Sequence, residues 1–194
     1  MDFVPFAART HENMLDVLMH PEAPGPSVHY YMIRGGSEKR NITVWETGAV
    51  GGEYIKTYGH YHVDDLPETY WIAHGEGIAL LQKRVVEAGV PQNDRLEYFK
   101  AVRVKAGDVI HIAPREGHLV VNTGKEWLAT VDDSPVAGAS DSASMPAHAE
   151  YDSVKAMRGF AFYVVEQNGA PALIPNPLYK EVRKADLAGI PLAS

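Results

Sequence analysis

The sequence contains no cysteine among its 194 residues. Disulfide bonds, thiolate zinc sites and cysteine nucleophiles are therefore excluded, and any metal ion would have to be held by histidine and carboxylate side chains. Basic residues are also scarce: 18 lysines and arginines stand against 25 acidic residues, which gives a net charge of −7. This balance argues against a nucleic-acid-binding protein, because such proteins need a basic surface.

Long apolar runs are absent as well, and no stretch is long enough to span a bilayer. The opening residues, MDFVPFAARTHENML, lack the basic segment and the apolar core of a signal peptide. We therefore expect a cytoplasmic protein without membrane contact. With 45% hydrophobic and 22% charged residues, a chain of this length predicts a globular domain with a sizeable core.

Short strands separated by Gly, Pro, Asn and Asp are the main pattern of the chain. The expected strands are 27–34, 41–47, 53–57, 68–74, 77–85, 96–104, 108–113, 118–123, 126–133, 160–167 and 170–176. Many short strands at regular spacing predict an all-β sandwich or barrel. One short helix is expected within 9–26 and another within 176–189, and the Ser/Ala-rich stretch 134–152 is expected to be a surface loop.

A group of histidine and glutamate residues points to a metal site. His60 and His62 are two residues apart, so on a strand both imidazoles face the same side. Glu68 begins the strand after the next turn and can meet them across a hairpin, while His118 begins a later strand. Taken singly, each has an ordinary alternative role as an exposed or hydrogen-bonded residue. Three imidazoles and one carboxylate together suit Fe²⁺, Mn²⁺, Ni²⁺, Co²⁺ or Zn²⁺.

The spacing of these residues resembles the two sequence motifs of the cupin superfamily. The first reads Gly52-x7-His60-x-His62-x5-Glu68-x6-Gly75, and the second reads Gly107-x6-Pro114-x2-Gly117-His118-x3-Asn122. The longer stretches GGEYIKTYGHYH, PETYWIAHGEGIALLQ, IAPREGHLVVNTG and VVEQNGAPALIPNP are similar to the cupin-type glucose-6-phosphate isomerases known mainly from archaea. The similarity runs from about Asn41 to Pro177.

This resemblance implies an antiparallel β-barrel of jelly-roll type with a few short flanking helices. The barrel would comprise residues 41–177, preceded by an extension, 1–40, whose short helix packs on it, and followed by a helical tail, 178–194. The resemblance also implies a homodimer, which the exposed edges of such a sheet favour independently.

The resemblance further implies the roles of the site residues. One divalent transition metal ion per chain, with Fe²⁺ favoured, would be bound by His60, His62, Glu68 and His118. Residues in the KTYG segment and on an earlier strand would bind the substrate phosphate, namely Thr43, Thr57 and Gly59. The catalytic residues would be Glu68 and Tyr70. The reaction would interconvert glucose 6-phosphate and fructose 6-phosphate, as in glycolysis and gluconeogenesis.

Several points stay open at this stage. The stretch DSPVAG replaces a Tyr-Pro pair of the family, and His148 lies in an insertion that prevents its alignment with a later family histidine. Lys56 and Arg115 are candidates for a local cation, and Tyr70 could equally be a core aromatic residue. A hydride shift competes with proton transfer by Glu68. The alternatives are another cupin enzyme, such as an iron oxygenase or an isomerase of a different sugar phosphate, and a non-catalytic sugar-binding cupin.

Overall fold

The structure, a computed structural model, describes residues 6–35, 40–135 and 146–193. Helical structure in these residues is limited to a 3₁₀ helix, η1 (Glu12–Val17), and a short α-helix, α1 (Asp152–Ala156). The strands are β1 (Phe6–Thr10), β2 (Val28–Ile33), β3 (Asn41–Trp45), β4 (Ala49–Val50), β5 (Glu53–Tyr54), β6 (Tyr61–His62), β7 (Glu68–His74), β8 (Glu76–Glu87), β9 (Val90–Lys105), β10 (Val109–Ile112), β11 (Glu116–Asn122), β12 (Leu128–Asp132), β13 (Ala149–Glu150), β14 (Phe162–Gln167), β15 (Ala170–Pro175), β16 (Glu181–Val182) and β17 (Ala185–Asp186).

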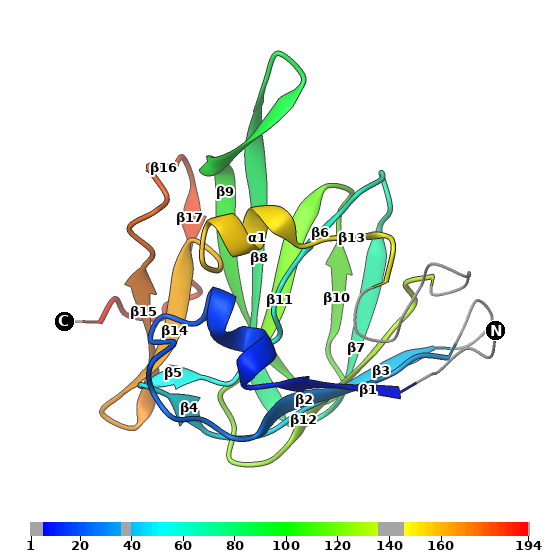
Figure 1. Cartoon of the computed structure of the whole chain (residues 1–194), viewed down its shortest axis with the longest axis vertical. Coiled ribbons are helices and arrows are strands. Elements are labelled where there is room, and N and C mark those ends of the chain that lie inside the picture. The colour runs from blue at the N-terminus through cyan, green and yellow to red at the C-terminus, as the bar shows by residue number, and fades with distance from the viewer. Residues whose placement is uncertain (1–5, 36–39, 136–145, 194) are drawn as a thin grey trace.

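Two antiparallel sheets make up the barrel (Figure 1). One has the order β1-β2-β3-β12-β7-β10, and the other has the order β11-β8-β9-β16. Bridges from Lys56 to Val121 and from His60 to His118 place the segment that ends in β6 beside β11. In chain order, the eight barrel strands β3 and β6 to β12 therefore cross from one sheet to the other at every step except that from β8 to β9, as they do in a jelly roll. The predicted all-β, antiparallel jelly-roll fold is confirmed.

The core lies between these sheets and continues behind β8. Six consecutive residues of β8, 77–82, are buried, as is all of β11. The hairpin β14–β15 explains part of this burial, because Phe162 packs on Phe99 of β9 with ring centroids 4.6 Å apart. The side chain of Gln82 binds the hydroxyls of Tyr61 and Tyr179 and accepts a hydrogen bond from the Ala161 backbone. Strands covered on both faces read as continuous apolar runs, which is the pattern of 77–82.

The chain ends differ from the sequence prediction. The expected C-terminal helix is wrong: this segment forms β16 and β17, which run parallel to β9. The edge of β9 offers backbone groups that pair with it, as when the N–H of Phe99 donates to the carbonyl of Lys184 at 2.8 Å. At the other end, β1 and β2 extend the six-stranded sheet, so residues before 41 form part of the barrel wall. The division of the chain into separate units stays a prediction.

Two further expectations concern a loop and membrane contact. The predicted loop 134–152 contains β13 and leads into α1, and its central part, 136–145, lies outside the described residues. Over the described ranges, no helix has the length and apolar character needed to cross a membrane.

A buried histidine pair lies where β1, η1 and β2 meet. His29 is fully buried, and its Nε2 is 3.0 Å from Nδ1 of His11. Burial, followed by the charges of His11 and Lys56, lowers the pKa of His29 to about 4. The folded protein therefore resists protonation of His29 at pH values where an unfolded chain, with a histidine pKa of about 6.5, accepts the proton.

We expect the free energy of unfolding to fall as the pH falls from about 6.5 to about 4, with a contribution from His29 on the order of 2–3 kcal/mol. The substitution His29→Gln removes the titrating group and should flatten this pH dependence in urea unfolding experiments. His20→Gln is the control, because His20 is half exposed and pairs only with Glu22 among the contacts described. Equal slopes for wild type and His29→Gln would contradict the assignment.

Candidate metal centre

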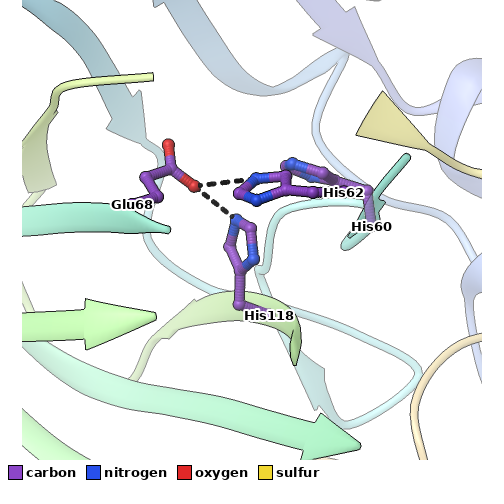
Figure 2. Close-up of side chains that lie close together, drawn as sticks. All are labelled: His60, His62, Glu68 and His118. Carbon is purple, nitrogen blue, oxygen red and sulfur yellow. Dashed lines mark ion pairs between the residues drawn. The ribbon is translucent and has the colours of Figure 1, made fainter. Parts of the chain in front are cut away.

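Four side chains from three strands converge inside the barrel (Figure 2). They are His60, His62, Glu68 and His118, and each offers a ligand atom within 4.8 Å of the others. The convergence follows from strand pairing. His60 and His118 form an antiparallel bridge, so their rings lie side by side with centroids 4.3 Å apart. His62 follows two residues later on the same face, with its ring centroid 5.2 Å from that of His118.

Glu68 completes the group from the opposite sheet. It is the first residue of β7, and its Oε2 lies 3.0 Å from Nε2 of His118 and 3.3 Å from Nε2 of His62. Figure 2 shows this oxygen directed at the two imidazoles while the second carboxylate oxygen points away from them. The four residues therefore come together as their spacing predicts, and they form a possible metal site. Their role as ligands stays a prediction.

The donor atoms of this cluster fit a metal ion. His62, Glu68 and His118 are almost completely buried. Their cluster-facing nitrogen and oxygen atoms, together with Nε2 of His60, have no hydrogen-bond partner within the described parts of the chain. Buried polar atoms without partners are costly and need an explanation. Three nitrogens and one oxygen converging in a dry interior are the donor set of a divalent transition metal, which would supply that missing partner.

A hydrogen bond on the side of the ring away from the cluster fixes the orientation of His62. Nδ1 of His62 is 2.8 Å from the carbonyl oxygen of Leu66, a contact that requires Nδ1 to carry the proton. The lone pair of Nε2 then faces the cluster. Metal-binding histidines are commonly fixed in this way, through a hydrogen bond donated by the nitrogen that does not bind the metal.

Protonation states also favour metal binding. Burial alone would raise the pKa of Glu68, but the imidazoles of His118 and His62, whose Nε2 atoms lie within 3.3 Å of its Oε2, hold it well below its usual value. The pKa of His60 lies well below its usual value because of burial and the neighbouring His118. At neutral pH Glu68 is thus a carboxylate and His60 a neutral imidazole, the forms that bind metal ions. His62 differs: burial lowers its pKa, but the contact with Glu68 raises it overall.

Tyr70 lies next to the cluster on β7. Its ring meets that of His118 edge-on, with centroids 5.4 Å apart. Burial raises the pKa of Tyr70 well above its usual value, and the carboxylates of Glu68 and Asp132 add to this effect. The phenol is therefore protonated at neutral pH and can donate a hydrogen bond to a molecule in the barrel.

The predicted phosphate-binding residues Thr57 and Gly59 flank Tyr58 just before His60. Thr57 is fixed to β11, because its N–H donates to the carbonyl of Val120 and its hydroxyl accepts from the N–H of Val120 at 3.1 Å. The hydroxyl proton of Thr57 remains available to a ligand. Gly59 has a φ of +80°, and a Cβ there would lie 2.9 Å from the ring of Phe160. Only glycine suits this position.

Thr43 lies across the barrel on β3. It is buried and is paired with Thr130 of β12, whose hydroxyl is buried without a hydrogen-bond partner in the described residues.

The candidate cations behave differently from the threonines. Lys56 forms a buried ion pair with Glu53, and exposed Arg115 pairs with Asp65. The charges of Lys56 and Arg115 are therefore both balanced by carboxylates.

Other residues near the cluster were missed or left unplaced by sequence reasoning. The ring of Tyr151 is 5.3 Å from that of His60, and the ring of His148 is 5.4 Å from that of His62. Both follow the part of the loop that is not described, where no periodicity indicates a contact. The position of Asp132 could have been predicted from the sequence, because it stands at an inward position of a predicted strand. It is paired with Tyr70 across β12 and β7, and with Arg34 at 3.6 Å.

Comparisons with known proteins place the chain in a family. The sequence model of the family described as "Glucose-6-phosphate isomerase (GPI)" matches residues 31–173. Glucose-6-phosphate isomerase of Thermococcus onnurineus is 32% identical over 139 residues, which cover 71% of this chain and 62% of that protein. The Pyrococcus furiosus enzyme of the same name is 31% identical over 141 residues, covering 72% and 63%. The chain thus spans less than two thirds of the length of these relatives.

A solved structure is also similar, though weakly. A predicted oxalate decarboxylase from Thermotoga maritima is 22% identical, with a TM-score of 0.37, over 53% of this chain and 76% of that chain. This score is too low to carry an argument. Strand order and the buried His/Glu cluster define a jelly-roll protein with a possible metal centre inside its barrel. Within that class, the family match shows that the chain belongs to the glucose-6-phosphate isomerase family.

We expect chelator-treated protein to bind about one Co²⁺ per chain, seen by its visible absorption, and to gain thermal stability on binding. His118→Ala should weaken Co²⁺ binding by more than 100-fold, because even the loss of a residue that only hydrogen-bonds to a metal ligand weakens binding by roughly 10- to 100-fold. His74→Ala is the matched control, since His74 is exposed and pairs with Glu126. Unchanged Co²⁺ affinity in a folded His118→Ala protein would contradict the site.

Proposed function

We propose that the chain is a metal-dependent aldose–ketose isomerase that interconverts glucose 6-phosphate and fructose 6-phosphate. The observation that carries the proposal is the buried cluster of three histidines and Glu68 in a chain of this family. The names of its archaeal relatives support the same reaction. We also propose Fe²⁺ as the native ion, a cytoplasmic location, and a place in glycolysis and gluconeogenesis.

The arrangement of Glu68 and Tyr70 supports a division of labour in this reaction. A bound divalent ion would supply Lewis acidity toward the sugar oxygens. Glu68 presents one oxygen to the imidazoles and directs the other away from them (Figure 2). In this proposal the second oxygen would take a proton from C1 or C2 and return it to the neighbouring carbon. Protonated Tyr70 would donate a hydrogen bond to a sugar oxygen.

A constraint on this mechanism comes from electrostatics. The lowered pKa of Glu68 makes its carboxylate a weak base. A direct hydride shift between C1 and C2 needs no base for the carbon-bound hydrogen, only transfer of the hydroxyl proton between O1 and O2, and is the competing route. The two differ in isotope exchange, because proton transfer through a base incorporates solvent deuterium into the product and a hydride shift does not.

We expect chelator-treated protein to convert fructose 6-phosphate only after addition of Fe²⁺, Mn²⁺ or Zn²⁺, followed through a coupled glucose-6-phosphate dehydrogenase. Glu68→Gln should lower kcat by about 10²-fold or more if Glu68 moves the proton. His111→Gln is the control, since His111 contacts the cluster through no described interaction and lies near Thr69. Metal binding without turnover would contradict the isomerase and would direct attention to other sugar phosphates and to O₂ consumption.

We further propose that the protein is a homodimer formed through the outer face of the six-stranded sheet. Three aromatic residues form a stacked row there: Phe6 on Tyr31, and Tyr31 on Trp127, each with ring centroids 6.1 Å apart. Ile33 and Ile42 on the adjacent strands are also exposed. Contiguous exposed apolar surface of this kind marks an interaction site, and a second copy of the same face is complementary to it.

We expect light scattering to give twice the mass of the chain for the wild-type protein. Trp127→Glu should shift the protein to the monomer, because the dimer would bury the added charge without a partner. Val90→Glu is the control, since Val90 is also exposed but lies at the tip of the β8–β9 hairpin (Figure 1). A wild-type monomer, or a Trp127→Glu dimer, would contradict the proposal.

A further inference from the structure

A cleft of about 920 Å³ opens at the end of the barrel away from the candidate metal centre. Four connections between strands line it, β7–β8, β9–β10, β11–β12 and β14–β15, together with Tyr54 of β5. A volume of this size falls within the range of small-molecule sites, roughly 300–1,000 Å³. The cleft is therefore large enough for a ligand that contacts several of these connections at once.

The cleft is separate from the His/Glu cluster, although the same strands reach both. β7 begins with Glu68 and ends with His74, next to Gly75 in the cleft. β11 contains His118 near its start and ends just before Thr123, which also lines the cleft. At about 3.3 Å per residue, β7 spans roughly 20 Å. A ligand in the cleft therefore does not contact the histidines or Glu68.

Strand alternation brings two cationic side chains to the cleft. Phe99 of β9 packs on Phe162 of the β14–β15 hairpin. Arg103 and Lys105 follow Phe99 at even spacing, so their side chains leave the same face of the strand. Both are exposed and line the cleft, as does the turn of the covering hairpin, 169–171. The two cations therefore lie at the end of β9 that the hairpin leaves open.

The cleft collects positive charges that have no partner among the described residues. Its third cation is Lys125, in the β11–β12 connection. Within the described ranges, the side chains of Arg103, Lys105 and Lys125 form no ion pair, hydrogen bond or aromatic contact. Every other described lysine and arginine pairs with a carboxylate or lies over an aromatic ring, except Arg158 and Lys184. Most of these unpaired charges therefore gather in one cleft, in a chain whose net charge is −7.

Three acidic residues also line the cleft: Glu76, Asp108 and Glu126. Two of them have partners, because Asp108 Oδ2 accepts from the N–H of Lys105 at 2.9 Å and Glu126 lies 3.2 Å from Nε2 of His74. Glu76 stands opposite Lys105 in the β8–β9 register, and its side chain has no ion pair or hydrogen bond in the part of the chain that the structure describes. Its oxygens are free to accept hydrogen bonds from hydroxyl groups.

An aromatic ring completes the cleft. Tyr54 is half-buried, and its hydroxyl forms no hydrogen bond with a described residue. Burial and the charge of Glu166 raise the pKa of Tyr54, so the phenol is neutral at physiological pH. Pro171 lines the cleft as well. An aromatic face beside cationic side chains is the combination that binds a flat base together with its phosphates.

We propose that the cleft binds a nucleoside polyphosphate, such as a nucleoside diphosphate. The phosphate groups contact Arg103, Lys105 and Lys125 through charge-assisted hydrogen bonds. The ribose hydroxyls donate to Glu76, and the base stacks on the ring of Tyr54. An inorganic anion uses neither of these two side chains and meets the charge of Glu76 as repulsion. The proposal does not rest on the proposed function, because this ligand binds away from the reacting atoms.

Calorimetric titration with ADP tests the proposal. We expect the wild-type protein to bind about one ADP per chain, and Arg103→Gln/Lys105→Gln to bind ADP about 10-fold more weakly, as the loss of two exposed charge contacts predicts. Lys100→Gln/Lys184→Gln is the matched control, since it removes the same charge from exposed positions outside the cleft. Wild-type protein that binds no ADP, or equal ADP affinity in wild type and the cleft variant, would overturn the site.

Pyrophosphate tests the part of the proposal that concerns the nucleoside. We expect ADP to bind about 10-fold more tightly than pyrophosphate, because stacking of the base adds to the phosphate contacts. Tyr54→Leu keeps an apolar side chain but removes the ring, and it should reduce this difference. Pyrophosphate that binds as tightly as ADP to the wild-type protein would overturn the nucleoside assignment.

A folding defect in Arg103→Gln/Lys105→Gln would leave the decision to Lys125→Gln. This single substitution lies in an exposed connection, away from β9. We expect the same direction of change in ADP affinity, but a smaller one. An unchanged ADP affinity in Lys125→Gln would then count against the proposal.

Discussion

The antiparallel bridge between His60 and His118 is the contact on which the site depends. The N–H of each residue donates to the carbonyl of the other, at 3.3 Å and 3.0 Å. This pair brings together two imidazoles that are far apart in the sequence, and it places His62 beside them through strand alternation alone. It also anchors the preceding segment on β11, so that Thr57 meets Val120 in a fixed register.

Burial and charge act against each other around this bridge. A dry interior disfavours every ion in it, yet Glu68 is held as a carboxylate because two imidazoles contact one of its oxygens. The same interior keeps Tyr70 protonated. One enclosure therefore stabilises an acceptor and a donor on the same strand, and such a pairing of unlike protonation states is what acid–base chemistry requires.

Local rules predicted the all-β fold and the grouping of the four clustered residues, whereas the jelly-roll arrangement was implied by the resemblance of the motifs to a known family. Alternation along strands groups His60 with His62, and turn residues mark where Glu68 and His118 begin their strands. Sequence reasoning failed where tertiary contacts decide. The C-terminal segment has helix-forming residues but pairs with the free edge of β9. Arg9 is far from the motifs in sequence, and no periodicity indicates that its strand faces Tyr58.

Lys56 shows the limits of residue type as a guide. Its charge and its place next to Thr57 suggested an anion-binding role. Strand alternation turns its side chain away from the face of Thr57, and there Glu53 balances its charge. Alternation along a strand is enough to predict that Lys56 faces away from Thr57, but it does not predict that Glu53 is the partner of Lys56.

The edge position of β1 has an evolutionary consequence. Among the described strands, β1 pairs with β2 alone, while the strands that carry the histidines and Glu68 lie within the barrel. Substitutions in β1 can therefore alter the inward surface at Arg9 without moving any of those four residues. A change in β1 disturbs the pairing of one neighbouring strand, whereas β7 and β11 each pair with strands on both sides, so this edge tolerates divergence more readily than the strands that carry Glu68 and His118.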